Sequence, residues 1–171
     1  MVVVAIIGIL SAIAIPSINK YMAKARQSEA KTNLASIYTA NKAFFAEFNI
    51  YDSRFETIGY RPEGKMRYNV GFQTSPVCPV INFGYPRNPT ATAAQNSVSV
   101  CTVGSAIPTN GSCVVLADGN QTITGDTVNC NSGAAAFTAA SAGRIASSTN
   151  NIDRWTINNN KVLANTSDGT Q

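Results

Sequence analysis

The sequence contains no histidine, only nine acidic residues and no charged residue before Lys20. Without histidine, the Ser–His and Cys–His pairs of the common nucleophilic enzymes are impossible. The four acidic residues after position 67 are scattered, and Asp118 with Asp126 lacks the ligand repeat and closing glutamate of a calcium loop. We therefore predict no catalytic residue, no metal ligand and no cofactor, and we expect that the protein is not an enzyme.

Close cysteine pairs are also missing. The four cysteines lie 23, 12 and 17 residues apart, at Cys78, Cys101, Cys113 and Cys130. Thiolate zinc sites usually contain close pairs, so this spacing argues against a zinc site. An even number of cysteines in a loop-rich region predicts two disulfides and an oxidising compartment. All three connectivities remain open, although sequential pairing closes the shortest loops on average.

Charge is distributed unevenly along the 171 residues. Residues 20–67 hold nine basic and five acidic side chains, which accounts for the whole formal charge of +4, and the remainder of the chain is balanced. This excess is small and is spread along a helix and a loop. A dedicated nucleic-acid surface is normally more concentrated, so DNA as a partner is compatible with the sequence but unsupported by it.

Residues 1–19 form an uncharged, mostly apolar run. As a helix, this run would be roughly 28 Å long, close to the ~30 Å hydrocarbon core of a bilayer. A cleaved signal peptide would carry basic residues before its apolar core, and a buried core helix is seldom apolar on every face. The basic residues Lys20, Lys24 and Arg26 instead follow the run, as they do beside a membrane span. We predict a membrane-inserted helix.

The helical pattern continues beyond Lys20 to about residue 48, which would make one helix some 70 Å long. Apolar residues recur at three- and four-residue steps on one face: Ala30, Leu34, Ile37, Tyr38, Phe44, Phe45 and Phe48. The sequence thus divides into an apolar helix half (1–19), an amphipathic half (20–48) and a globular head (49–171). Within the head we expect a loop at 49–67 and a cysteine-bearing variable region at 74–135.

Several short strands are predicted in the head. Residues 68–72 alternate after a turn signal, and residues 136–145, which are mostly small, predict a strand packed closely against a large neighbour. Valines at 98, 100, 114 and 128, with Leu116, indicate further short strands. Residues 155–157 and 161–163 flank three asparagines and predict a hairpin, because asparagine tolerates positive φ. The predicted fold class is α+β, with one long helix packed on an antiparallel sheet.

Several stretches resemble a known family. MVVVAIIGILSAIAIPSINKYMAKARQSEAKTNL resembles the N-terminal helix of type IV pilins, the subunits of retractable bacterial surface filaments. IYTANKAFFAEF, IGYRPEGKMRYNVGF and DRWTINNNKVLANT resemble the helix end, the following loop with its first strand, and the closing hairpin of the same family. Aligning Gly8 and Pro16 with the family pattern places Met1 six residues into a mature pilin. The family's N-methylated phenylalanine and its glutamate would then lie upstream.

The resemblance implies a structural subunit that polymerises with itself through its N-terminal helix, with the pilin fold. It implies residence in the inner membrane before assembly, and contact with the prepilin peptidase, the pilus assembly machinery and an outer-membrane secretin. The extracellular filament would serve adhesion to surfaces or other cells, twitching motility and DNA uptake. In the family, the helix between the positions of Gly8 and Pro16 loses helicity in the filament. The alternative for these two residues is a tolerated kink in a membrane helix.

Two other functions fit parts of the sequence. A type II secretion pseudopilin shares the helix but forms a short periplasmic piston, and its major form usually carries a calcium site that we do not find in the sequence. A membrane-anchored periplasmic module that binds sugar or DNA would explain the apolar segment and the disulfides. It would not explain Gly8, Pro16 and the unbroken helix.

Overall fold

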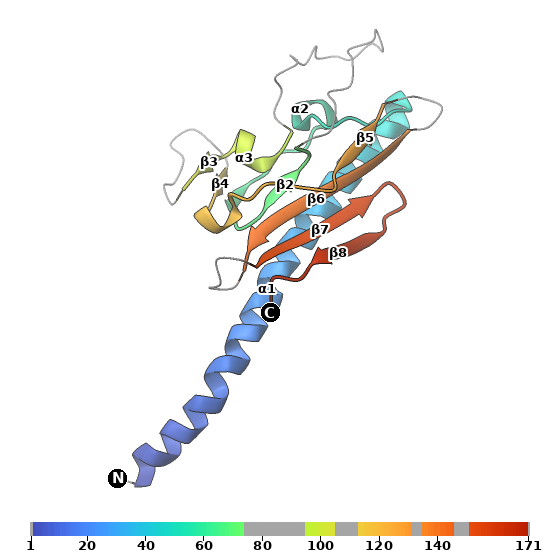
Figure 1. Ribbon diagram of the computed structural model, residues 1–171. Helices are drawn as coiled ribbons and strands as arrows, with labels where there is room; N and C mark the ends of the chain where they lie inside the picture. The colour runs from blue at the N-terminus through green and yellow to red at the C-terminus, as the bar shows by residue number, and fades with distance from the viewer. Residues whose placement is uncertain (1, 74–94, 105–112, 131–134, 146–150, 171) are drawn as a thin grey trace.

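The computed structural model describes residues 2–73, 95–104, 113–130, 135–145 and 151–170. One long helix, α1 (Val2–Phe48), forms a spine that projects far beyond the head at its N-terminal end (Figure 1). Its C-terminal half lies against a β-sheet, and the chain ends beside the middle of the helix. The predicted α+β fold, with a long N-terminal helix on an antiparallel sheet, is confirmed.

Helix α1 ends where the sequence changes to a turn. Asn49 has a φ of 60° and its N–H donates to the carbonyl of Phe45 at 2.8 Å. Asparagine is one of the few residues besides glycine that enters this left-handed conformation readily, and it commonly closes helices in this way. The turn lets the following residues, Ile50 and Tyr51, fold back and become buried.

The larger sheet has the order β2-β6-β7-β8 and is antiparallel throughout. Its strands are β2 (Asn69–Gly71), β5 (Thr127–Asn129), β6 (Ala136–Arg144), β7 (Ile152–Asn158) and β8 (Leu163–Ser167). Strand β6 is central, because β2 and β5 both pair with it on the side opposite β7. The strands predicted at 68–72 and 136–145 are therefore confirmed, with slightly shorter bounds.

A second, smaller sheet was not anticipated from the sequence. It has the order β1-β4-β3 and consists of β1 (Gly64–Met66), β4 (Cys113–Val115) and β3 (Thr102–Val103). Both of its strand pairs are parallel. Strands this short, and brought together from distant parts of the chain, leave no periodic pattern in the sequence.

The expectation of short strands at each valine was right in two places and wrong in others. Val114 lies in β4 and Val128 in β5. Val98 and Val100 instead lie in a short helix, α3 (Ser97–Val100), because Asn96 and Ser99 form a reciprocal capping box at its start. Leu116 follows β4 and precedes the 3-10 turn η1 (Ala117–Gly119).

The loop expected at 49–67 contains regular structure. A short helix, α2 (Phe55–Ile58), is closed by Gly59 in the left-handed conformation at φ 72°, and β1 begins at Gly64. The variable region expected at 74–135 lies outside the described residues at 74–94, 105–112 and 131–134.

The closing hairpin is present, but its turn differs from the prediction. The residue with positive φ is Lys161, at 63°, and no asparagine of the turn takes this conformation. The asparagines act through side chains instead, since the Asn158 side-chain oxygen accepts from the N–H groups of Asn160 and Val162 at 3.0 Å each. A side-chain oxygen that replaces a backbone acceptor is the usual contribution of asparagine to turns.

The core lies between the sheet and one face of α1. Ala30, Leu34 and Ile37 are fully buried there, and Phe44 is nearly so. Aromatic rings continue the core toward the end of the helix: Phe45 stacks on Tyr51 with centroids 4.6 Å apart, and Tyr51 meets Phe137 of β6 at 4.8 Å. The apolar face predicted for the second half of α1 is therefore the surface that holds the head.

Candidate functional site

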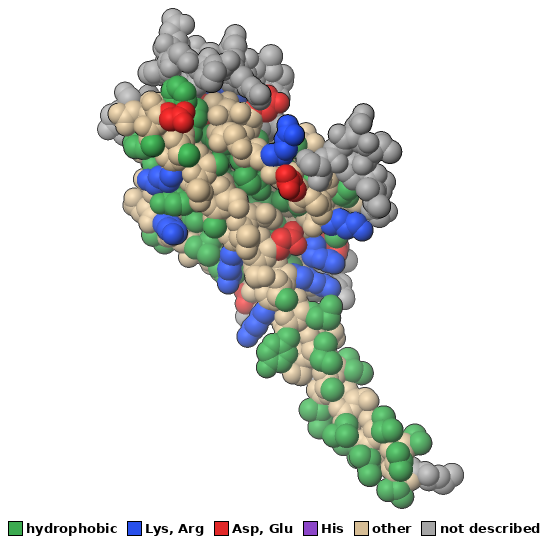
Figure 2. Space-filling model, turned by 180° about the vertical axis from the view of Figure 1, so that it is seen from behind, with side chains coloured by type: hydrophobic (Ala, Val, Ile, Leu, Met, Phe, Trp, Pro, Cys, Tyr) green, Lys and Arg blue, Asp and Glu red, His purple; other side chains and the backbone are tan. Residues whose placement is uncertain are grey.

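The first half of α1 is exposed on every side. Figure 2 shows apolar side chains along the visible face of the projecting helix. The exposed fractions of its large side chains range from 49% at Met22 to 74% at Val4, and the others are Val2, Val3, Ile6, Ile7, Ile9, Leu10, Ile13, Ile15, Ile18 and Tyr21. By length and composition, α1 contains a stretch that can cross a membrane. No face of this stretch is turned toward the subunit's own head.

Such a surface is unfavourable in water. Each large aliphatic side chain gains roughly 1.5–3 kcal/mol when it is transferred fully from water to an apolar environment. Ten valine, isoleucine and leucine side chains together therefore favour an apolar environment by some tens of kcal/mol at most. Apart from the bond that Pro16 cannot donate, the helical backbone satisfies its own hydrogen bonds, so the segment is compatible both with lipid and with a bundle of similar helices.

Gly8 and Pro16 both lie inside this exposed half. A Cβ atom added at Gly8 would meet nothing within 4 Å, and its φ is not positive. The subunit itself therefore does not need glycine at this position. Pro16 has no N–H and cannot donate to the carbonyl of residue 12, so one helical hydrogen bond is missing there. The side chain of Pro16 lies outside what the structure describes.

The second half of α1 is attached to the head by polar contacts as well as by the core. The Arg26 guanidinium donates to the carbonyl of Ile145, just after β6, at 2.6 Å. The backbone N–H of Arg67 donates to the Glu29 carboxylate at 2.6 Å. The Lys31 ammonium lies 4.3 Å from the centroid of the Trp155 ring on β7. These contacts begin within one turn of the last exposed apolar side chain.

Asp153 of β7 is the centre of a hydrogen-bond cluster that joins α1 to three parts of the head. Its carboxylate is fully buried. It accepts from the Tyr68 hydroxyl (2.7 Å), the Trp155 indole N–H (2.7 Å), the Gln27 amide (2.9 Å), the Gly169 N–H (3.1 Å) and the Asn165 amide (3.2 Å). Five donors replace the water that the carboxylate loses on burial.

Two groups in the contact between α1 and the head, Tyr68 and Glu29, have shifted pKa values. Burial, together with the hydrogen bond to Asp153, raises the pKa of Tyr68 far above its ordinary value, so its hydroxyl stays a donor. Burial also raises the pKa of Glu29, and this effect outweighs the opposing hydrogen bond from the Arg67 backbone. The contact zone between helix and head therefore contains groups held in their protonated form more strongly than in water.

A second buried charge lies beyond the end of α1. Asp52 and Arg54 are both fully buried and form an ion pair in which Nε of Arg54 donates to Asp52 at 2.9 Å. The N–H of Asp52 donates to the Asn41 side chain of α1 at 3.3 Å. This pair anchors the turn that leads the chain from the helix into the head.

The disulfide prediction is only partly tested. Cys101 and Cys113 form a disulfide, which links α3 to the start of β4. Sequential pairing, the arrangement that closes the shortest loops on average, is therefore wrong. Cys101 directly precedes β3, and Cys113 is the first residue of β4. The two cysteines come together because β3 and β4 are neighbouring strands. Cys130 is also disulfide-bonded, and Cys78 lies outside the described residues.

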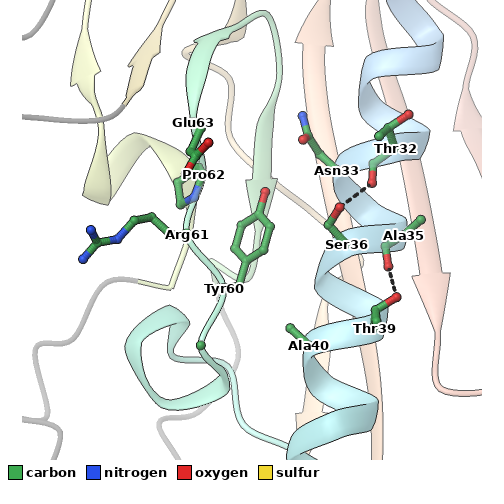
Figure 3. Close-up of a pocket in the computed structure, with 11 residues that line it drawn as sticks. Thr32, Asn33, Ala35, Ser36, Thr39, Ala40, Tyr60, Arg61, Pro62 and Glu63 are labelled. Atoms are coloured by element: carbon green, nitrogen blue, oxygen red, sulfur yellow. Dashed lines mark hydrogen bonds between the residues drawn. The ribbon is translucent and has the colours of Figure 1, made fainter.

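A groove of about 670 Å³ runs between the solvent-facing side of α1 and residues 59–63 (Figure 3). The α1 wall consists of small side chains, and the hydroxyls of Ser36 and Thr39 donate to carbonyls of their own helix. Burial raises the pKa of Tyr60 on the opposite wall to about 12, so this ring stays neutral. The lining contains no cysteine and no histidine and offers no nucleophile–base pair of the common types.

Within the ranges that the structure describes, no three histidine, cysteine, aspartate or glutamate side chains gather closely enough to hold a metal ion.

The roles of Asp153 and of the Asp52–Arg54 pair were not predicted from the sequence. For Asp153 one signal was available, because an aspartate at an inward-facing strand position requires hydrogen-bond donors around it.

Comparisons with known proteins agree with this geometry. A family model described as type IV pilin PilA matches residues 21–156. The chain is also similar to the type IV major pilin protein PilA of Myxococcus xanthus (strain DK1622), with 53% identity over 75 residues. That match covers 44% of this chain and 33% of the relative, so it spans about a third of the relative's length. Because the family model covers most of the sequence, and because the spine and sheet are those expected for it, the chain belongs to the type IV pilin PilA family.

Proposed function

We propose that this chain is a structural subunit of a type IV pilus and polymerises through the exposed half of α1. The observation that carries this proposal is the apolar cylinder of α1, which is exposed on every side and projects away from a separately packed head. A soluble monomer would gain nothing from such a segment, whereas a bundle of identical helices removes it from water. Polymerisation, and no catalysis, is the activity that this arrangement serves.

Before assembly, the same segment would lie in the inner membrane. Lipid and a helix bundle bury a similar apolar area, so the free energies of the two environments are close enough for transfer in either direction. This balance suits a filament that extends and retracts. The prepilin peptidase, the assembly machinery and the outer-membrane secretin are the partners we expect along this route. The assembled filament would then be extracellular.

The relative in Myxococcus xanthus is a major pilin by its name, and we propose the same role here. Adhesion, twitching motility and DNA uptake are the uses we expect of the filament. A type II secretion pseudopilin is the alternative, and it would leave no long filament on the cell surface.

Two matched variants test the role of the apolar half. Ile9→Lys places a charge on the exposed cylinder, whereas Val162→Lys places the same charge at a similarly exposed apolar position in the β7–β8 turn. We expect electron microscopy of material sheared from the cells to show filaments for the wild type and Val162→Lys and none for Ile9→Lys. Filaments of normal number in Ile9→Lys would contradict the proposal.

Intact-mass spectrometry of the same sheared fraction tests the identity of the subunit. We expect the protein to be the main species of this fraction and to be four hydrogens lighter than its reduced form, because of two disulfides. Retention of the protein in the cell envelope, with none in the sheared fraction, would support the pseudopilin instead.

Gly8 and Pro16 are proposed as the residues that let the helix extend in the filament. Glycine is dispensable for the subunit at position 8, and both residues weaken helices, which supports a role outside the monomer. We expect the double variant Gly8→Ala/Pro16→Ala to give stiffer filaments or to block assembly. Normal filaments with unchanged extension under force would remove this role.

A further inference from the structure

We propose that Lys20, Tyr21, Lys24 and Thr170 form a binding site for the phosphate of an anionic phospholipid headgroup, at the junction between the apolar half of α1 and the head. We call these four residues the cationic collar. The inference rests on the membrane-anchored stage of the proposed function. It names a ligand for that stage and places the ligand on the side of the membrane opposite the cytoplasm.

A hollow is present at this junction. It has a volume of about 380 Å³ and is lined by the four collar residues and Ser17. A second hollow of about 290 Å³ lies beside it, bordered by Asn19, Met22, Ala23, Arg26 and Ile145 and again by Lys20 and Thr170. Lys20 therefore stands between two spaces where the helix meets the head, and both are large enough for a phosphate group.

The two lysines are arranged to share one anion. They are four residues apart on α1, so their side chains leave the same face of the helix one turn apart. Both are exposed, and within the described residues neither forms an ion pair. Two like charges at this spacing repel each other, and an anion between them removes the repulsion. Arg26, in contrast, is directed to the head, where it donates to the carbonyl of Ile145.

The acidic group that acts on this site is Asp168, whose charge interacts with Lys24. Hydrogen bonds from the Thr170 N–H and hydroxyl lower the pKa of Asp168, so it is ionised at neutral pH. Its carboxylate is occupied by Thr170 and by the Gln27 amide at 3.2 Å. Among the described residues, Asp168 and the two lysines together carry a net positive charge.

The collar lies at the depth of a headgroup. Residues 2–19 span about 27 Å of helix, which matches the hydrocarbon core of a bilayer. Lys20 then begins the polar interface. Tyr21, with 70% of its surface exposed, has the amphipathic ring that is enriched at this level of the membrane.

The side of the membrane makes these lysines unusual. The disulfide between Cys101 and Cys113 places the head in an oxidising compartment, outside the cytoplasm. Cationic residues next to a membrane span are normally concentrated on the cytoplasmic side. Two lysines on the opposite side therefore need another reason, and binding of lipid phosphates supplies one.

Native mass spectrometry of the full chain in neutral detergent tests the site. Phosphatidylglycerol and phosphatidylcholine are titrated separately, and the lipid-bound fraction is measured for four proteins: wild type, Lys20→Gln/Lys24→Gln, Lys20→Arg/Lys24→Arg and Lys65→Gln/Lys161→Gln. The last variant removes the same charge from two exposed lysines of the head. We expect the wild type to bind phosphatidylglycerol about tenfold more tightly than phosphatidylcholine. The arginine pair and the head pair should keep this preference, and the collar glutamine pair should lose it.

The site would be overturned by an equal affinity of the wild type for both lipids, by an unchanged preference in the collar glutamine pair, or by an equal loss of preference in the head pair. Binding of inorganic phosphate at the collar without a preference for phosphatidylglycerol would also overturn it. Partitioning of the wild type into phosphatidylcholine vesicles separates the two proposals. No partitioning contradicts the membrane-anchored stage itself, whereas partitioning without a headgroup preference contradicts the collar alone.

Discussion

The two halves of α1 share one continuous helical backbone and have opposite relations to the rest of the subunit. Residues 2–19 are uncharged and mostly apolar, and the described side chains from Val2 to Met22 are exposed, whereas residues 23–48 bury one face against the sheet. Ala23 is the first buried side chain, and Arg26, Gln27 and Glu29 follow it with hydrogen bonds to the head. The transition thus takes place within two turns of helix.

This difference shows that the two parts of one helix can be stabilised by different surroundings. The second half is stabilised within the subunit, by packing in the core and by the hydrogen bonds of the Asp153 cluster. The first half contributes no packing to the subunit, so its hydrophobic free energy remains available for lipid or for neighbouring helices. We therefore expect substitutions in the two halves to affect different properties, and four experiments test this.

The largest effect is expected when Asp153 is replaced, because this substitution removes hydrogen bonds that hold the second half of α1 against the head. Asp153→Ala leaves several buried donors, including the Tyr68 hydroxyl, without their acceptor and detaches Gln27 from β7. We expect a loss of about 3–5 kcal/mol in the free energy of unfolding, measured by circular dichroism in denaturant. Asp168→Ala is the control, since this carboxylate lies at the surface, and it should change little. Equal effects of the two substitutions would show that the cluster does not hold the helix.

A matched pair of alanine substitutions compares the halves directly. Leu34 is fully buried in the core, whereas Ile9 has 64% of its surface exposed. Leu34→Ala should lower the free energy of unfolding of the head by about 2–5 kcal/mol, through lost burial and a cavity. Ile9→Ala removes a similar apolar volume and should leave the unfolding of the head in detergent unchanged. A clear loss of stability in Ile9→Ala would mean that the first half does contact the head.

A smaller effect is expected at the contact between Lys31 and the face of Trp155. Lys31→Ala removes the cation–π interaction and should cost about 0.5–1 kcal/mol of stability. Trp155 is the only tryptophan of the chain, so its fluorescence reports on the contact and follows unfolding at the same time. Lys31→Arg keeps a cation over the ring and should retain most of the stability. Identical unfolding curves for the alanine variant and the wild type would contradict the prediction.

The smallest effect is expected for the pH dependence of the free energy of unfolding. Glu29, in the second half of α1, is the group that we expect to cause it. Burial raises the folded-state pKa of Glu29 above its ordinary value near 4.5. The stability it contributes is therefore complete below pH 4.5 and is lost as the pH rises through the folded-state pKa. Glu29→Gln should flatten this part of the curve of unfolding free energy against pH, while Glu47→Gln, at an exposed position, should not. A curve unchanged by Glu29→Gln would show that Glu29 is not the responsible group.

The long helix and the hairpin could be predicted because their signals are local. Both the uncharged run of residues 1–19 and the three- and four-residue spacing from Ala30 to Phe48 relate residues that are close in sequence and lie on neighbouring turns of one helix. The same reasoning failed at Val98 and Val100, where the capping box of Asn96 and Ser99 determined a short helix. Apolar residues in a stretch of four do not distinguish a helix from a strand.

By itself, the sequence determined that one helix would be apolar all round in its first half and one-sided in its second, and that the head would be α+β. Only the tertiary structure decided how the halves are held: the acceptor for Gln27 lies 126 residues away, and the partner of Tyr68 lies 85 residues away. It also decided that Cys101 bonds Cys113, because β3 and β4 run side by side. The periodicity of apolar residues indicates which side chains become buried. It does not report which distant group meets a buried charge, because that depends on the folding of the whole chain.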